Sequence, residues 1–407
     1  MMQGQFLGMI YTGAWLCLDE FNRIDIEVLS VIAQQILCMR NALNSKVESF
    51  MFDGMQVKSE DFKYLGVFTT MNPGYAGRTE LPDNLKVLFR PVSMMVPDYA
   101  SIAEILLYSE GFKNAQELAV KLTKLYKLAS EQLSQQKHYD FGMRAVKSIL
   151  SMAGILKREN PENDEDLLLI QAMKDVNLPK FLEDDKKLFN AIVSDLFPGK
   201  HHEKYVEDEF LRGLEFAVKE LNIKPVLTFM EKCSEFNDIL KIRFGSMLVG
   251  PPMTGKSTVL HTVRTAYDHL NFSGESKNSF YRNIDAVFLN PKSITMGELY
   301  GETNPLTGDF KNGLASKFFS DFAVRETKEF KWIIFDGPVD SLWIESLNSV
   351  LDDSRTLCLA NGKRIRLKDD MRVFFEVEDL NQASPATVSR VGMVYLDDGV
   401  VEPLDIA

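Results

Sequence analysis

Cysteine is scarce in this chain, and its few cysteines stand far apart. Four occur among 407 residues, and no two of them form a CxxC pair: Cys17, Cys38, Cys233 and Cys358. Single cysteines so widely spaced argue against a disulfide framework and are typical of a reducing compartment. We therefore expect a cytosolic protein.

Long apolar runs and an excess of positive charge are also missing. No stretch of about 18 uncharged apolar residues occurs, and the N-terminal segment has no basic region before an apolar core, so neither a membrane span nor a signal peptide is predicted. The 58 acidic residues outnumber the 46 basic ones, giving a formal net charge of -12. This balance argues against nucleic acid or an anionic membrane as a partner of a whole domain. The chain is expected to be soluble and intracellular.

The hydrophobic pattern of the first hundred residues indicates an α/β layer. Trp15–Leu18 and Leu65–Thr70 are predicted to be buried strands, and Ile26–Met39 is predicted to be a helix. The strand signal then disappears. From Tyr99 to Leu196 apolar residues recur at helical spacing, as at Leu118, Leu122, Leu125 and Leu128.

A second α/β pattern follows, with a strand predicted at Met247–Val249. We therefore predict three domains: an α/β domain at residues 1–98, an all-α domain at residues 99–196 and a second α/β domain at residues 197–407. The two α/β parts resemble each other. Each has an apolar strand ending in an aspartate, a helix, a hairpin centred on Gly54 or Gly362, and a second buried strand.

A glycine-rich segment of the second α/β part matches the phosphate-binding pattern GxxxxGK[ST]. It follows an apolar strand and opens a helix, which is the context that the pattern requires. In such a loop, main-chain N–H groups surround a phosphate, the lysine reaches the β- and γ-oxygens, and the last hydroxyl ligates Mg²⁺. The sequence predicts an ATP and Mg²⁺ site formed by Gly250, Pro251, Pro252, Met253, Thr254, Gly255, Lys256, Ser257 and Thr258.

An acidic residue at the end of an apolar strand usually completes such a site, because it joins the Mg²⁺ shell through water. Asp336 fits this role. Gly337 follows it, however, where a hydrolytic site would carry a carboxylate to orient the attacking water. The first α/β part has both acids as Asp19-Glu20, a metal-shell acid and a candidate base, but no GxxxxGK[ST] precedes them. We expect binding without efficient hydrolysis at the second site and no significant hydrolysis at the first.

Longer runs closely resemble the dynein heavy chains, a family of AAA+ motors. The runs are Gly13–Asp25 and Thr70–Asn84, which are similar to the first AAA+ module, Leu178–Gly199, similar to the connection between modules, and Ser384–Arg390, similar to the end of the second large domain. The resemblance implies P-loop AAA+ large domains with three α/β/α layers and an all-α lid domain between them.

The resemblance also implies roles for single residues. Asn72 matches the sensor that positions the water or γ-phosphate, and Arg144 matches the lid arginine that reports on that phosphate. Arg390 matches the arginine finger that the second module presents to the first module's nucleotide, and Arg90 holds the equivalent place in the first module. In the second module the sensor position falls at Glu378, or at Asp379 if the register slips, and an ionised carboxylate cannot donate a hydrogen bond.

The family implies an ATPase motor that moves along microtubules towards their minus ends. Its expected partners are the remaining AAA+ modules and the linker of the same chain, microtubules through segments absent here, and dynein intermediate and light chains. Ser384–Arg390 is more similar to axonemal than to cytoplasmic members, so the cytoskeleton of a cilium is the expected location. Two alternatives stay open: a regulatory nucleotide-binding fragment without turnover, and another tandem AAA+ machine such as a giant ribosome-maturation ATPase.

Overall fold

The structure is a computed structural model that describes residues 2–24, 26–58, 60–71, 81–200, 208–273, 280–304 and 306–397. The chain divides into two compact units, Met1–Pro97 and Asp98–Ala407. Asn72, the predicted sensor, lies outside the described residues. None of the described helices is both long and apolar enough to cross a bilayer.

The first unit packs helices and a hairpin around a small apolar core. Its helices are α1 (Met2–Thr12), η1 (Phe21–Arg23), α2 (Ile26–Ser45), η2 (Asp61–Tyr64) and α3 (Asp83–Lys86), and its strands are β1 (Trp15–Leu18), β2 (Ser49–Phe52), β3 (Met55–Lys58) and β4 (Gly66–Thr69). Phe6 and Ile10 of α1, Leu29 of α2, and Phe52 and Val57 of the hairpin are fully buried in this core.

Strands β1 and β4 form where the sequence predicts strands, but the prediction that both are buried is wrong. They pair in parallel as a two-stranded sheet, with Leu18 opposite Thr69. Trp15 is 74% exposed and Phe68 is 49% exposed. Among the described residues, β1 and β4 have no strand on their outer sides. The side chains of Trp15 and Phe68 therefore lack neighbours from further strands. The apolar pattern predicted a buried sheet, but the described residues of this unit leave part of the sheet exposed.

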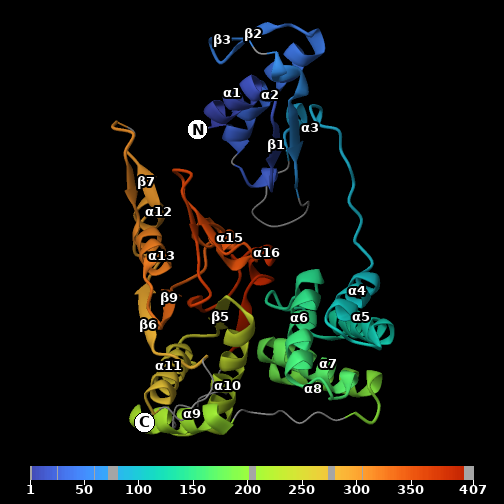
Figure 1. The fold of residues 1–407 in the computed structure, drawn as a ribbon, viewed down its shortest axis with the longest axis vertical. Helices are drawn as coiled ribbons and strands as arrows, with labels where there is room; N and C mark the ends of the chain where they lie inside the picture. The colour runs from blue at the N-terminus through green and yellow to red at the C-terminus, as the bar shows by residue number, and fades with distance from the viewer. Residues whose placement is uncertain are drawn as a thin grey trace. The chain divides into compact units, whose positions relative to one another are not determined.

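The second unit begins with helices. These are α4 (Tyr99–Ser109), α5 (Ala115–Gln132), α6 (Met143–Glu159), α7 (Glu165–Asn177), η3 (Leu178–Lys180) and α8 (Glu183–Leu196), which gather into one group in Figure 1. Leu118, Leu122 and Leu125 face its core, since each is at most 1% exposed. The leucine spacing of the sequence thus marks the buried face of α5.

The rest of the second unit is built on a five-stranded parallel sheet. The strands are β5 (Gly245–Val249), β6 (Ile284–Leu289), β9 (Phe330–Asp336), β12 (Met371–Val377) and β13 (Gly392–Tyr395), and their order in the sheet is β13-β5-β12-β9-β6. All four pairings are parallel. Parallel strands present their carboxyl ends at one edge, where ligand sites of such sheets lie.

Helices cover both faces of this sheet, which confirms the predicted three-layer α/β/α fold. Trp332 and Ile334 of β9 pack with α9 (Asp208–Glu220), α10 (Leu227–Ile242) and α11 (Lys256–Ser273). Ile333 and Phe335 point the other way and pack with α13 (Leu314–Val324), α14 (Ser341–Glu345) and α15 (Asn348–Leu351). The alternation along β9 follows from the two-residue period of a strand. Near-complete burial on both faces explains its apolar sequence.

Short elements complete the second unit. They are α12 (Met296–Tyr300), the hairpin β7 (Gly301–Thr303) with β8 (Phe310–Asn312), the hairpin β10 (Thr356–Cys358) with β11 (Arg364–Arg366), and α16 (Pro385–Val388). The two predicted glycine-centred hairpins are both present. Asp53 and Gly54 both have positive φ, of 45° and 81°, as a two-residue turn requires. In the second hairpin only Gly362 is left-handed, with φ of 83°, because its loop is longer.

The helical group packs against the edge of the sheet through polar and aromatic contacts. The His138 ring stacks on Tyr395 of β13, with centroids 4.9 Å apart and planes within 1°. Lys137 donates to the Asn381 side chain at 2.9 Å, and Lys147 forms an ion pair with Asp353 at 2.8 Å. These contacts fix the helix α6 beside the loops that follow β12 and α15.

Candidate nucleotide-binding site

The predicted phosphate-binding loop lies between the central strand β5 and the helix α11. Its backbone is sharply bent, with Met253 at φ 70° and Gly255 at φ 86°. A Cβ on Gly250 would lie 2.2 Å from the Leu396 main-chain oxygen, so glycine is required where the loop leaves the sheet. Thr254 is buried and donates to the Pro251 main-chain oxygen at 2.9 Å, which holds the loop closed. Helix α11 therefore begins directly after this bent loop, and its first N–H groups lie at the end of the loop.

Lys256 and Ser257 open helix α11 and carry the polar groups of the loop. The Lys256 ammonium donates to the main-chain oxygens of Gly250 and Pro251 at 2.6 and 2.7 Å. Desolvation lowers the pKa of Lys256, and three carboxylates oppose that shift: Glu376, Glu378 and Asp336, in decreasing order of effect. The acids near Lys256 thus favour its charged form against the effect of burial.

Glu376 is the acid in direct contact with the loop, and sequence reasoning missed it. Its carboxylate accepts a hydrogen bond from the Ser257 hydroxyl at 2.5 Å, although only 4% of Glu376 is exposed. Burial raises the pKa of Glu376, and Asp336 raises it further, while the bond from Ser257 lowers it. An acidic residue inside the mainly apolar strand Met371–Val377 is the sequence signal that could have found it.

Asp336 ends strand β9 and is exposed at the carboxyl edge of the sheet. Its register partner on β12 is Glu376. The main chain of Gly337 donates to the Glu376 main-chain oxygen at 3.3 Å. A Cβ on Gly337 would lie 3.1 Å from the Asn290 side-chain oxygen and 3.3 Å from Pro291, so a larger residue fits there only if those neighbours shift slightly.

The first unit has a related strand end. The Thr70 hydroxyl donates to the Asp19 carboxylate, and the main-chain N–H of Glu20 donates back to that hydroxyl at 2.9 Å. Glu20 has left-handed backbone angles, φ 52° and ψ 45°, an uncommon conformation for a residue other than glycine. Both acids stand at the end of β1, as predicted.

The two registers favour Glu378 as the residue of the second unit that matches the predicted sensor. Leu18 pairs with Thr69, so Asp19 follows at the level of Thr70, two residues before Asn72 in the sequence. Asp336 pairs with Glu376, which is two residues before Glu378. The choice of Glu378 over Asp379 stays a prediction, because Asn72 lies outside the described residues.

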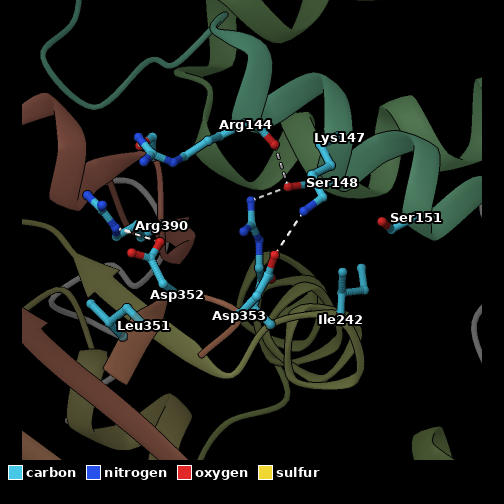
Figure 2. A pocket seen from close by; sticks show the side chains of 11 residues that line it. Arg144, Lys147, Ser148, Ser151, Ile242, Leu351, Asp352, Asp353 and Arg390 are labelled. Atoms are coloured by element: carbon cyan, nitrogen blue, oxygen red, sulfur yellow. Dashed lines mark hydrogen bonds and ion pairs between the residues drawn. The ribbon is translucent and has the colours of Figure 1, made fainter. Parts of the chain in front are cut away.

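A cavity of about 180 Å³ brings the predicted lid arginine and arginine finger together (Figure 2). Arg144, near the start of α6, and Arg390, after α16, both line it, with Arg243 and Lys147 adding positive charge. The Arg144 guanidinium donates to the Ser389 hydroxyl at 3.4 Å. Residues 245 positions apart in the sequence thus meet in one basic pocket.

Arg390 is held in place by neighbours within its own domain. Its Nε pairs with Asp352 at 2.7 Å, and Nη1 donates to the Ala386 main-chain oxygen at 2.7 Å. Its side chain is only 11% exposed. Arg90 of the first unit is exposed by contrast.

Two family models match this chain. Residues 1–257 match the family model described as the hydrolytic ATP binding site of dynein motor region. Residues 245–391 match the model of the AAA domain, dynein-related subfamily. Nucleotide binding is therefore the function that both parts of the chain share with their families, and the alternative of an unrelated tandem AAA+ machine is set aside.

Curated relatives cover nearly the whole chain. Human dynein axonemal heavy chain 6 is 54% identical over 97% of the chain and 10% of its own length. Human dynein axonemal heavy chain 1 is 52% identical over 98% of the chain and 9% of its own length, and human dynein axonemal heavy chain 3 is 47% identical over 96% and 9%. The chain thus spans about a tenth of the length of these relatives. It belongs to the dynein heavy-chain family and carries AAA+ domains of that family's motor region.

Proposed function

We propose that the second α/β domain binds MgATP tightly and hydrolyses it very slowly. The observation that carries this proposal is the bent loop of Gly250–Ser257 with Lys256 at its end, facing Asp336 and Glu376, while Gly337 offers no side chain. Mg²⁺ would neutralise phosphate charge there. Ser257 would be its ligand, with Asp336 in the surrounding shell. The residues present fit the ion, because a hydroxyl and buried carboxylate oxygens are the ligands that Mg²⁺ prefers.

Slow turnover follows from what the second site offers to an attacking water. In the first unit Glu20 follows the strand-end aspartate, and in the second unit Gly337 takes that place. At the sensor position Asn72 is matched by Glu378, which has no proton to donate when ionised. Orientation of the water and stabilisation of developing charge account for most of phosphoryl-transfer catalysis. The second site lacks side chains for both tasks, whereas the residues expected to bind phosphate are all present.

We further propose that Asp19, Glu20, Asn72, Arg144 and Arg390 serve nucleotide hydrolysis by the first module, with Asp19 in its Mg²⁺ shell. The meeting of Arg144 and Arg390 in one basic pocket supports this role for the two arginines. Arginine is suited to it, because its planar fork binds phosphate oxygens in pairs. The chain alone has no GxxxxGK[ST] before Asp19, so we expect no significant hydrolysis at Asp19 in this chain.

In the complete protein these modules would belong to a microtubule motor. We propose that the chain works with the other AAA+ modules and the linker of its heavy chain, with intermediate and light chains, and on microtubules through other segments. Its relatives are named axonemal, so the cytoskeleton of a ciliary axoneme is the proposed location. A purely regulatory nucleotide site is the second candidate for this chain by itself, favoured by Gly337.

Separate measurements of binding and turnover test the proposal. Calorimetry should detect MgATP binding to the chain, while phosphate release in a single turnover should be far slower than release from an active AAA+ module. Lys256→Ala should weaken the binding by roughly 100-fold. Brisk phosphate release that Lys256→Ala abolishes would show that the second site is hydrolytic and would refute the proposal.

A further inference from the structure

The hydroxyl of the phosphate-binding loop is paired with an acid on an unexpected strand. Ser257 has one hydroxyl proton, and it is donated to Glu376 on β12. Asp336, the acid expected to attend Mg²⁺, ends the neighbouring strand β9 and is exposed. A hydroxyl that donates its proton to a carboxylate keeps its lone pairs for a cation. The bond therefore orients Ser257 as a metal ligand.

The second carboxylate oxygen of Glu376 is left without a partner. Oε1 is fully buried and makes no hydrogen bond within the described part of the chain, while Oε2 holds Ser257. A buried acceptor without a partner costs about 1–3 kcal/mol, and more when it is charged. The other oxygen of the same carboxylate holds Ser257 of the phosphate-binding loop, so a ligand of that loop is what would satisfy Oε1.

Charge at the strand ends points to a cation. Glu376 and Asp336 are register partners on adjacent parallel strands, and Glu378 comes directly after the strand that carries Glu376. Lys256 immediately precedes Ser257, the residue that Glu376 contacts. Once Lys256 pairs with phosphate, the acids are left to repel each other, and a divalent ion relieves such repulsion.

We propose that Glu376 is a carboxylate of the Mg²⁺ shell in the second nucleotide site, supplied by β12 in addition to Asp336 on β9. The proposal rests on the proposed function, since it concerns the metal that accompanies ATP. Glu376 acts as a positioning residue: Oε2 fixes the Ser257 hydroxyl, and Oε1 is an acceptor for the hydrated ion. In the first unit Thr70 stands at the matching place, so this acid distinguishes the second site.

The test is the effect of Mg²⁺ on nucleotide affinity. A fluorescent ATP analogue is titrated into the chain in Mg²⁺ and in EDTA, for the wild type, Glu376→Gln and Asp336→Asn. Glu326→Gln, an exposed position away from the loop, is the matched control. Loss of a carboxylate partner behind a metal ligand weakens metal binding about 10–100-fold. Glu376→Gln should lower the enhancement by Mg²⁺ to that extent and leave affinity in EDTA unchanged.

Retention of the full Mg²⁺ enhancement by Glu376→Gln would overturn the proposal. Absence of ATP binding by the wild type, or an affinity that Lys256→Ala leaves unchanged, would instead defeat the proposed function, so the two failures are distinct. Melting curves without nucleotide report whether each variant folds. Should Glu376→Gln not fold, Glu376→Asp keeps the charge and decides the matter: Mn²⁺ affinity of the ATP-loaded chain, measured by electron paramagnetic resonance, should fall, and an unchanged affinity contradicts the role.

Discussion

The two strand-end sites share a backbone register and differ in the side chains that meet there. In the first unit Thr70 stands opposite Asp19, and its hydroxyl donates to that carboxylate. In the second unit Glu376 stands opposite Asp336, and the hydroxyl comes from Ser257 of the phosphate-binding loop. The same hydroxyl–carboxylate pair is thus formed in both, but with the acid on opposite strands.

This exchange changes what each site can do. Two acids, Asp19 and Glu20, follow β1, whereas β9 ends in one acid, Asp336, which is joined by Glu376 inside β12 and by Glu378 just after it. We therefore expect the position of each acid relative to its strand, and not the number of acids alone, to decide whether a site hydrolyses ATP.

The largest expected effect concerns Arg390, the arginine that the second module would provide to the nucleotide site of the first. In the complete motor, Arg390→Ala should lower microtubule-stimulated ATPase activity by roughly 10³–10⁵-fold, because an arginine finger stabilises transition-state charge. Arg390→Lys should not restore it, since an ammonium lacks the planar fork. Affinity for MgATP at Lys256 should stay nearly constant by calorimetry.

Asp352→Asn is the matched control for this arginine, because it breaks the ion pair at 2.7 Å and leaves the guanidinium in place. The structure gives Asp352 as the ion-pair partner of Arg390. A loss of only a few-fold in Arg390→Ala, equalled by Asp352→Asn, would leave Arg390 a structural residue.

Converting the second site to the pattern of the first should give the next largest effect. The double variant Gly337→Glu with Glu378→Asn supplies a base and a donor together, and a positioned base contributes about 10²–10⁴-fold in rate. Single-turnover phosphate release measures the gain. Gly337→Ala with Glu378→Asn is the control, because it fills the same space beside Asn290 without a carboxylate. No gain in a double variant that still binds MgATP would show that other groups limit turnover.

Removal of the loop lysine should act on binding alone. Lys256→Ala leaves phosphate without its main cation, a loss of about 3 kcal/mol or roughly 100-fold in Kd. Calorimetry measures it. Lys292→Ala is the control, since Lys292 is paired with Asp340 away from the loop, and it should bind MgATP like the wild type. Equal affinities for all three proteins would place the nucleotide elsewhere.

The smallest expected effects compare the two hairpins. Gly54 and Gly362 have φ of 81° and 83°, and an added Cβ would meet nothing within 4 Å at either. Alanine should therefore cost only backbone strain, about 1–2 kcal/mol in each unit. Urea denaturation measures the change. Gly8→Ala in α1, where φ is ordinary and space is open, should instead stabilise the first unit by about 0.5–1 kcal/mol.

Much of this fold could be predicted from local pattern. The strands β1, β4 and β5 and the helices between Tyr99 and Leu196 lie close to where the apolar pattern of the sequence indicates. The loop of Gly250–Ser257 could also be predicted, from its match to the pattern GxxxxGK[ST]. Burial of β1 and β4 could not be predicted, because exposure depends on neighbouring strands rather than on the strand's own residues.

Glu376 and the partner of Arg390 needed the tertiary structure. Glu376 follows five residues of a buried strand, and only the parallel pairing of β12 with β5 brings it beside Ser257, 119 positions earlier. Asp352 precedes Arg390 by 38 residues and ends α15. An acid that ends a strand leading to the site can be predicted from the sequence. An acid that comes near the site only because two strands pair in the sheet cannot.

The order of strands in the sheet also bears on how the chain would fold during synthesis. The central strand β5 pairs with β12 and β13, which begin at Met371 and Gly392. During synthesis, β5 and its loop would leave the ribosome before β12 and β13. More than a hundred residues would then be added, at about 5–20 residues per second, before either strand could pair with β5. Its apolar side chains, buried in the finished sheet, are exposed for that time. The nucleotide site would therefore be the last part of this unit to form, and the emerging chain would be most prone to aggregation before β12 arrives.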